Sequence, residues 1–200
     1  MKLEKARRLW RQLVTSLFVI ITLTVTLAEA QTTDADFHRP DFSLPDLTGK
    51  LRSVTEWDGK AMIINFWATW CVPCKREIPL FNQLDAATDD NDLQVLGIAL
   101  DKPENVKTYL QQFPMSYLTL VEEHKAQELA AVFTGDSLVL PFTVFLDHKG
   151  RVFWMQVEEI YREQADVILD YINRVKAGEL SYEQAQQQLV QAVQAARSGN

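Results

Sequence analysis

The two cysteines of this 200-residue chain lie three residues apart, in Trp70-Cys71-Val72-Pro73-Cys74. They could form a structural disulfide, hold a metal ion or act as a redox dithiol. A disulfide that closes so short a loop removes little entropy from the unfolded chain, so it would add little stability. Two thiolates fill half of a tetrahedral zinc shell, and no His-x-x-x-His motif completes it, although copper(I) accepts two thiolates. The redox dithiol fits the spacing best.

The position of the pair in the chain also favours redox chemistry. Residues 61–67 form a nearly continuous apolar run, which predicts a strand buried on both faces, and residues 72–88 have a helical pattern. Cys71 is therefore expected at a helix N-terminus, where unpaired N–H groups and the helix dipole favour a thiolate. Cys71 would attack a client disulfide, and the more buried Cys74 would resolve the mixed disulfide.

The rest of the body alternates predicted strands and helices. The other strands are expected at residues 93–100, 117–121, 141–147 and 151–157, after an early hairpin at 42–54 that turns at Gly49. The other helices are expected at residues 103–113, 124–133, 161–176 and 181–197. This order predicts an α/β layered fold with a mixed sheet.

The amino terminus has the features of an export signal. Residues 2–11 carry five Lys or Arg against one Glu, residues 13–28 contain no charge, and Ala28-Glu29-Ala30 follows. This pattern predicts a signal peptide cleaved near Ala30. The alternative is an uncleaved anchor with residues 13–28 as a membrane tether, although a spanning helix needs about 20 residues. Both predictions place the body in a periplasmic or other extracytoplasmic, oxidising compartment.

Composition divides the chain further and excludes one class of partner. We divide it into a signal peptide or anchor (1–30), a linker (31–39), a globular domain (40–177) and a Gln-rich helical tail (178–200). The formal net charge is −7, and residues 31–200 alone hold fifteen Lys and Arg against twenty-five Asp and Glu, a net charge of −10. So acidic a body argues against nucleic-acid binding. The sequence indicates no cofactor and no metal site.

The Gln-rich tail has a thin apolar stripe formed by Leu189, Val193 and Ala196. A stripe at spacings of four and three residues fits one face of a helix. We expect a terminal helix that docks on the domain, with a partner-binding helix as the alternative.

Residues 66–79, Phe-Trp-Ala-Thr-Trp-Cys-Val-Pro-Cys-Lys-Arg-Glu-Ile-Pro, resemble the active-site segment of membrane-associated thioredoxin-like proteins of the TlpA/ResA type. Residues 40–50 resemble the lead-in hairpin of that family, and residues 140–147 resemble its proline loop and following strand. The resemblance covers residues 40–174. It implies a thioredoxin fold with a central mixed sheet flanked by helices, an N-terminal hairpin extension, and thiol–disulfide oxidoreductase activity.

The resemblance also implies a client-binding surface around the disulfide. Pro141 matches the cis-proline of the family, which faces the disulfide and leaves the backbone of Leu140 to pair with an extended client segment. Trp70 is expected beside the disulfide, where it shapes the contact surface, and Pro73 stiffens the loop between the cysteines. These four residues are the predicted substrate-binding set.

Proton transfer is assigned by the same resemblance. Glu77 matches a glutamate that tunes the cysteine pKa values and relays protons, so it joins Cys71 and Cys74 in the predicted catalytic set. Asn65 stands where many cytosolic thioredoxins carry a buried Asp. Since an amide does not transfer protons as a carboxylate does, that role passes to Glu77 or to water.

The chain departs from one subgroup of the family. Members devoted to cytochrome c maturation usually carry a Gly-rich stretch and an acidic residue after the cis-proline. This chain instead has Asp136-Ser-Leu-Val-Leu140 before Pro141 and Phe142 after it. Leu140, Phe142 and Trp70 are expected to form an apolar rim that suits an apolar or unfolded client segment.

The predicted function is an exported thiol–disulfide oxidoreductase that reduces disulfides in client proteins. The resemblance implies a membrane thiol electron donor and suggests a link to cytochrome c maturation. Two alternatives stay open: a net disulfide oxidant, because direction depends on the reduction potential, and a non-enzymatic copper chaperone. A peroxidase is disfavoured because the Pro-x-x-x-Thr-x-x-Cys motif is absent before Cys71.

Overall fold

The computed structural model describes residues 37–87, 92–135 and 139–198. The predicted signal peptide or anchor, most of the linker and residues 136–138 before the proline lie outside the described residues. Among the described residues, no helix is both long enough and apolar enough to cross a membrane.

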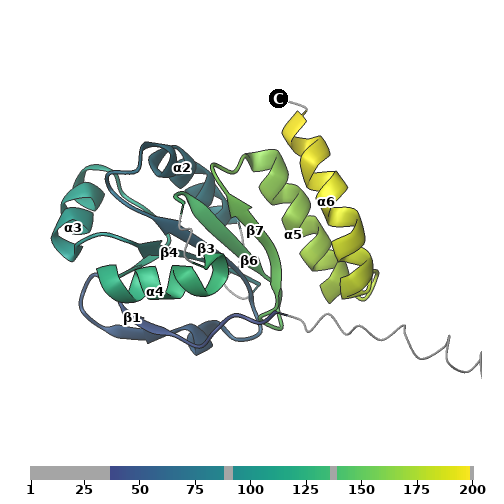
Figure 1. The fold of residues 1–200 in the computed structure, drawn as a ribbon, viewed down its shortest axis with the longest axis horizontal. Helices are drawn as coiled ribbons and strands as arrows, with labels where there is room; N and C mark the ends of the chain where they lie inside the picture. The colour runs from purple at the N-terminus through teal and green to yellow at the C-terminus, as the bar shows by residue number, and fades with distance from the viewer. Residues whose placement is uncertain (1–36, 88–91, 136–138, 199–200) are drawn as a thin grey trace, which may run out of the picture. The chain divides into compact units, whose positions relative to one another are not determined.

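The centre of the fold is a five-stranded mixed sheet (Figure 1). β3 (Ala61–Trp67) lies in the middle, with β4 (Leu93–Ala99) parallel to it and β5 (Leu118–Val121) parallel to β4. On the other side β6 (Phe142–Leu146) pairs antiparallel with β3, and β7 (Val152–Val157) pairs antiparallel with β6. The predicted mixed sheet is confirmed, and every residue of β3 is buried as its apolar run predicts.

Helices cover both faces of the sheet. They are α2 (Val72–Ala87), α3 (Pro103–Gln112), α4 (Glu123–Thr134), α5 (Arg162–Lys176) and α6 (Tyr182–Ser198). Successive strand residues point to opposite faces, so Ile64 shares a core with Leu129 of α4, while Ile63 shares one with Phe81 of α2 and Ile168 of α5. Figure 1 shows α4 across the near face of the sheet.

The early hairpin consists of β1 (Ser43–Pro45) and β2 (Leu51–Ser53), and Gly49 in its turn has a φ of 89°. The short helix that follows it, η1 (Val54–Trp57), was not expected from the sequence. Its signal is a capping box in which Ser53 and Glu56 bind each other's backbone. One turn is too short for a hydrophobic period to show.

The Gln-rich tail is a docked helix. α6 lies beside α5 (Figure 1) and buries Ala185, Leu189 and Val193, whereas Ala196 is only half-buried. Two side chains of α6 bind the outer edge of the sheet: the Tyr182 hydroxyl donates to the Val152 carbonyl (2.8 Å) and the Gln186 amide donates to the Phe153 carbonyl (2.9 Å). These bonds occupy carbonyl groups of edge strand β7 that could otherwise pair with another chain.

Gly97 of β4 is expected to tolerate no side chain. A Cβ there would lie 3.1 Å from the Tyr117 ring, 3.2 Å from Thr119 Oγ1 and 3.2 Å from Trp67 Nε1. We expect Gly97→Ala to lower the free energy of unfolding by about 1–3 kcal/mol, as overpacking does in a dense core. Urea unfolding measures this. The double variant Gly97→Ala with Thr119→Ala should recover part of the loss, and a single variant as stable as the parent would contradict the packing.

Candidate functional site

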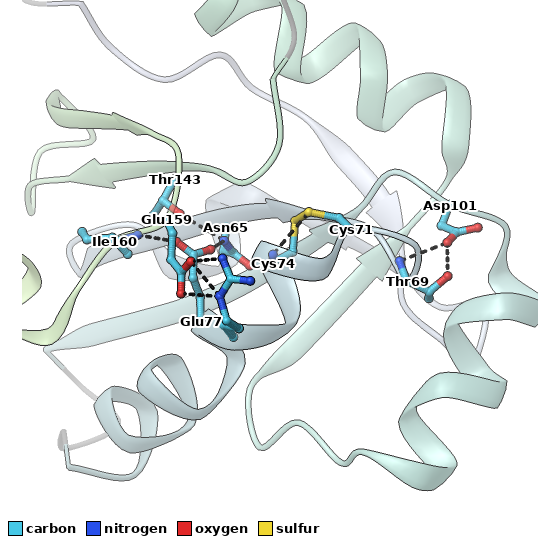
Figure 2. The surroundings of a disulfide bond; sticks show 10 residues. Asn65, Thr69, Cys71, Cys74, Glu77, Asp101, Thr143, Glu159 and Ile160 are labelled. Atoms are coloured by element: carbon cyan, nitrogen blue, oxygen red, sulfur yellow. Dashed lines mark hydrogen bonds and ion pairs between the residues drawn. A yellow bond between two sulfur atoms is a disulfide. The ribbon is translucent and has the colours of Figure 1, made fainter.

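Cys71 and Cys74 form a disulfide at the junction of β3 and α2, with sulfur atoms 1.99 Å apart (Figure 2). Cys71 immediately precedes α2, and Cys74 lies in its first turn. The residues are 4% and 0% exposed, so Cys74 is the more buried, as expected. The backbone N–H of Cys74 donates to the Cys71 sulfur (3.3 Å). This N–H would stabilise a thiolate at Cys71 when the bond is reduced.

Asp101 fixes the loop before Cys71, a role that was not predicted from the sequence. Its carboxylate accepts from the Thr69 backbone N–H (3.1 Å), the Thr69 hydroxyl, the Lys102 N–H (2.7 Å) and the Asn105 amide (2.8 Å). Burial alone would raise the pKa of Asp101, but these bonds outweigh it and the pKa is lowered. A signal was available: Asp101 closely follows β4, and parallel β3 ends at the same edge of the sheet.

Loss of this carboxylate is expected to loosen the loop. Asp101→Ala leaves the N–H and hydroxyl of Thr69 without their acceptor, so we expect the free energy of unfolding to fall by about 2–4 kcal/mol. Chemical denaturation checks this, with Asp170→Ala, at an exposed position of α5, as the matched control for lost charge. Equal stability of the two variants would show that Asp101 does not hold the loop.

Glu77 is a buried carboxyl one turn beyond Cys74 in α2. It is 1% exposed; Oε1 accepts from the Ile160 N–H (2.6 Å), and Oε2 accepts from the Asn65 amide (3.4 Å). Asn65 also donates to the Thr143 hydroxyl (3.0 Å). Burial raises the pKa of Glu77 to about 8, the bonds from Ile160 and Asn65 oppose the rise, and the negative charge of Glu159 adds to it. This pKa lies close to that of a thiol, which suits proton exchange with a cysteine.

Residues 158–160 tie separate parts of the site together. The Glu158 N–H donates to the Pro141 carbonyl (3.1 Å), the Glu159 carboxylate accepts from Arg76 of α2 (2.9 Å), and the Ile160 N–H binds Glu77. None of these roles was predicted from the sequence. The available signal was the Glu158-Glu159 pair directly after strand β7.

A groove of about 280 Å³ borders the disulfide loop. It is lined by Pro73, Arg76, Leu140, Pro141, Glu158, Glu159, Tyr161 and Arg197. The Leu140–Pro141 peptide bond is cis. Three members of the predicted substrate-binding set therefore meet here. The fourth, Trp70, is 67% exposed just before Cys71 but does not line this groove.

The prediction of an apolar rim is wrong for one of its three residues, Phe142. Phe142 is 1% exposed and stacks on Phe66, with ring centroids 5.6 Å apart. The reason is register: Phe142 begins β6 directly opposite Phe66 of β3, so both side chains point into the same core. Trp70 and the half-buried Leu140 remain as the apolar part of the surface.

The two cations after Cys74 have partners. The Lys75 ammonium lies 5.3 Å from the centre of the Tyr109 ring, and Arg76 Nε lies 3.0 and 2.9 Å from the two oxygens of Glu159.

Over residues 37–87, 92–135 and 139–198, no group of three or more His, Cys, Asp or Glu side chains could hold a metal ion. The arrangement brings together a disulfide, a buried carboxyl with a raised pKa and a groove beside the disulfide loop.

Comparisons with known proteins agree with this chemistry. Residues 37–155 match the family model AhpC/TSA. The thiol-disulfide oxidoreductase ResA of Geobacillus thermodenitrificans is 30% identical over 156 residues, which cover 75% of this chain and 87% of that protein. The thioredoxin-like protein YneN of Bacillus subtilis is 28% identical over 66% of this chain and 76% of its own. A crystal structure of a thiol:disulfide interchange protein from Chlorobium tepidum matches with a TM-score of 0.63 and 26% identity, covering 70% of this chain and 97% of that one.

Proposed function

Because this chain belongs to the AhpC/TSA family and is a ResA-like thiol–disulfide oxidoreductase, we propose that it reduces disulfides in client proteins outside the cytoplasmic membrane. Cys71 is the nucleophile, Cys74 is the resolving thiol, and Glu77 exchanges the proton. Trp70, Pro73, Leu140 and Pro141 bind the client. The observation that carries the reductive direction is the buried carboxyl of Glu77 beside buried Cys74.

Direction depends on how strongly the protein stabilises its reduced form. A strong oxidant is one whose thiolate is held by surrounding charges. Here Cys74 is fully buried, and a buried thiolate is disfavoured by desolvation. Above its pKa of about 8, ionised Glu77, one turn away, would add like-charge repulsion. Both effects disfavour ionisation of Cys74, so the reduced pair lacks at this cysteine the thiolate stabilisation that makes a strong oxidant, which supports donation of electrons to a client.

The reaction takes two steps. The Cys71 thiolate attacks one sulfur of the client disulfide, which forms the Cys71–client disulfide and releases the first client thiolate. Cys74 then loses its proton and attacks the Cys71 sulfur, which closes Cys71–Cys74 and releases the second client thiolate. Two electrons pass to the client, and two protons complete its thiols. A membrane thiol donor returns two electrons to the Cys71–Cys74 disulfide.

Glu77 supplies the proton exchange of the second step. Its carboxylate form accepts the Cys74 proton, and its carboxyl form returns a proton when the disulfide is reduced again. A pKa of about 8 lets Glu77 exist in both forms near neutral pH. Asn65 contributes a hydrogen bond to Glu77 and no proton transfer.

Export is supported by the basic, apolar and Ala-x-Ala segments of residues 1–30. A cytochrome c apoprotein is one client class within the proposal. The chain lacks the Gly-rich stretch and the acidic residue near Pro141 that are usual in family members devoted to cytochrome c maturation, so this client class is not favoured. Trapping of clients on Cys74→Ala identifies them, because that variant forms the mixed disulfide but cannot release it.

The equilibrium reduction potential of the Cys71–Cys74 pair tests the direction. A value near that of thioredoxin, about −270 mV, is expected for a reductant. A value near that of a strong oxidant, about −120 mV, would reverse the direction. Tight copper(I) binding by the reduced protein without any disulfide exchange would replace the enzyme with a copper chaperone.

A further inference from the structure

We propose that Glu158 binds a lysine or arginine beside the client cysteine, and that Arg197 of α6 occupies this carboxylate when no client is bound. The proposal rests on the proposed function, since it concerns which clients the same groove selects. Glu158 and Arg197 both line the groove with Pro73 and Pro141. Four observations support it.

The first observation is the backbone of Glu158. Its φ is 72°, and among the described residues it is the only non-glycine with a positive φ. This conformation is unfavourable for a residue with a Cβ and is open to glycine. The Glu158 N–H bond to the Pro141 carbonyl holds it in place. Strained residues of this kind concentrate at functional sites, and here the strained residue carries a carboxylate and lines the groove.

The second observation is that the Glu158 carboxylate makes only a long, exposed ion pair with Arg197. Arg197 Nη2 lies 3.4 Å from Glu158 Oε2, and the side chains are 56% and 68% exposed. The neighbouring pair differs, because Arg76 Nε contacts both oxygens of Glu159 and Glu159 is only 18% exposed. A single, long, solvent-exposed ion pair contributes little free energy. A client cation can therefore displace Arg197 from Glu158 while the Arg76–Glu159 pair stays intact.

The third observation is how α6 delivers Arg197. Its residues follow β7 in order: Tyr182 binds Val152, Gln186 binds Phe153, and Arg197 contacts Glu158 just beyond the strand. Fifteen helical residues span about 22 Å, and six extended residues span about 20 Å. The helix is thus long enough to bring its last turn to the groove. α6 lies beyond residues 37–155, the part of the chain that matches the family model.

The fourth observation is charge. Residues 31–200 carry a net charge of −10, which attracts basic polypeptides. A client segment that extends along Leu140 and Pro141 would bring residues next to its cysteine within reach of Glu158. Arg197 already places a guanidinium on this carboxylate and marks the position that a client lysine or arginine would take.

The test uses two disulfide-containing peptides that differ only in the residues flanking one cysteine, lysine in one and glutamate in the other. The second-order rate of peptide reduction by the fully reduced protein is measured at low salt. We expect the lysine peptide to react about three- to tenfold faster, a range set by partly exposed charge pairs. Arg197→Ala should widen this ratio, because it frees the carboxylate.

Three variants distinguish direct contact between Glu158 and the peptide lysine from long-range attraction between the acidic protein and a basic peptide. Glu158→Gln and Glu158→Gly should bring the rate ratio towards one. Glu128→Gln, at an exposed position of α4, removes the same charge and should keep the parental ratio. Glu158→Gly should be at least as thermally stable as the parent, because glycine accepts a φ of 72°, so misfolding would not explain its lost preference.

The outcomes separate this proposal from the proposed function. If the parent reduces neither peptide, the reductase function fails. If it reduces both and Glu158→Gln keeps the parental ratio, or shifts it no more than Glu128→Gln does, the role of Glu158 is overturned while the function stands. If Arg197→Ala lowers the rate with the lysine peptide, Arg197 is not a competitor for the carboxylate.

Discussion

Cys71→Ser is expected to abolish disulfide exchange, a loss of more than about 10³-fold in rate. The serine hydroxyl does not ionise near neutral pH and forms no mixed disulfide, so the first step has no nucleophile. The rate of reduction of a protein disulfide, followed with a regenerating thiol reductant, measures the loss.

Cys74→Ser is the matched variant, since it removes the same disulfide but keeps the nucleophile. It should carry out the first step and then accumulate the Cys71–client adduct, visible by mass spectrometry and released by reductant. Closing a loop this short contributes at most about 2 kcal/mol to stability, so both variants should stay folded. Exchange activity in Cys71→Ser, or an adduct on Cys74 in that variant, would assign the nucleophile to the other cysteine.

The second large effect is a fall in the stability of the oxidised protein as the pH rises. The pKa of Glu77 is about 8 in the folded protein, against the ordinary value of 4.5. Between these two values the unfolded chain releases the Glu77 proton while the folded protein keeps it. The folded state binds more protons, so stability decreases with pH across this window and levels off above it. The full decrease from this group is on the order of 5 kcal/mol.

Glu77→Gln should remove this dependence. The glutamine oxygen can still accept from the Ile160 N–H, and a half-turn of the Asn65 amide would bring its Oδ1, which is buried and has no partner among the described residues, to the glutamine NH2 as an acceptor. Urea unfolding from pH 5 to pH 9 should give a profile without this decrease for the variant, and it should be more stable than the parent at pH 9. Glu128→Gln, at an exposed position of α4, should keep the pH dependence of the parent's stability.

The same variant tests the proton role of Glu77. Resolution of the mixed disulfide should slow by about 10²-fold at neutral pH, because general acid–base catalysis supplies gains of this size. Attack by Cys71 should keep its rate. If the free energy of unfolding of Glu77→Gln falls with pH as steeply as that of the parent, the Glu77 carboxyl is not the source of the pH dependence, whatever the effect on activity.

The sequence by itself determined the elements and the chemistry of the disulfide. The strands and long helices follow their predicted spans closely, because hydrophobic periodicity is a property of neighbouring residues. Cys71 and Cys74 lie at the predicted strand-to-helix junction for the same reason. The resemblance of residues 66–79 added Glu77 to the site, but not the burial of its side chain or its bond to Ile160.

The tertiary structure decided which distant segments meet at that junction. Glu77 binds Ile160, 83 positions away, because β6 inserts beside β3 and brings the segment after β7 over α2. The same strand order turns Phe142 into the core. It also brings α6 along β7 and Arg197 to Glu158. Such contacts depend on strand order and packing between elements far apart in the chain, and the periodicity within each element does not encode them.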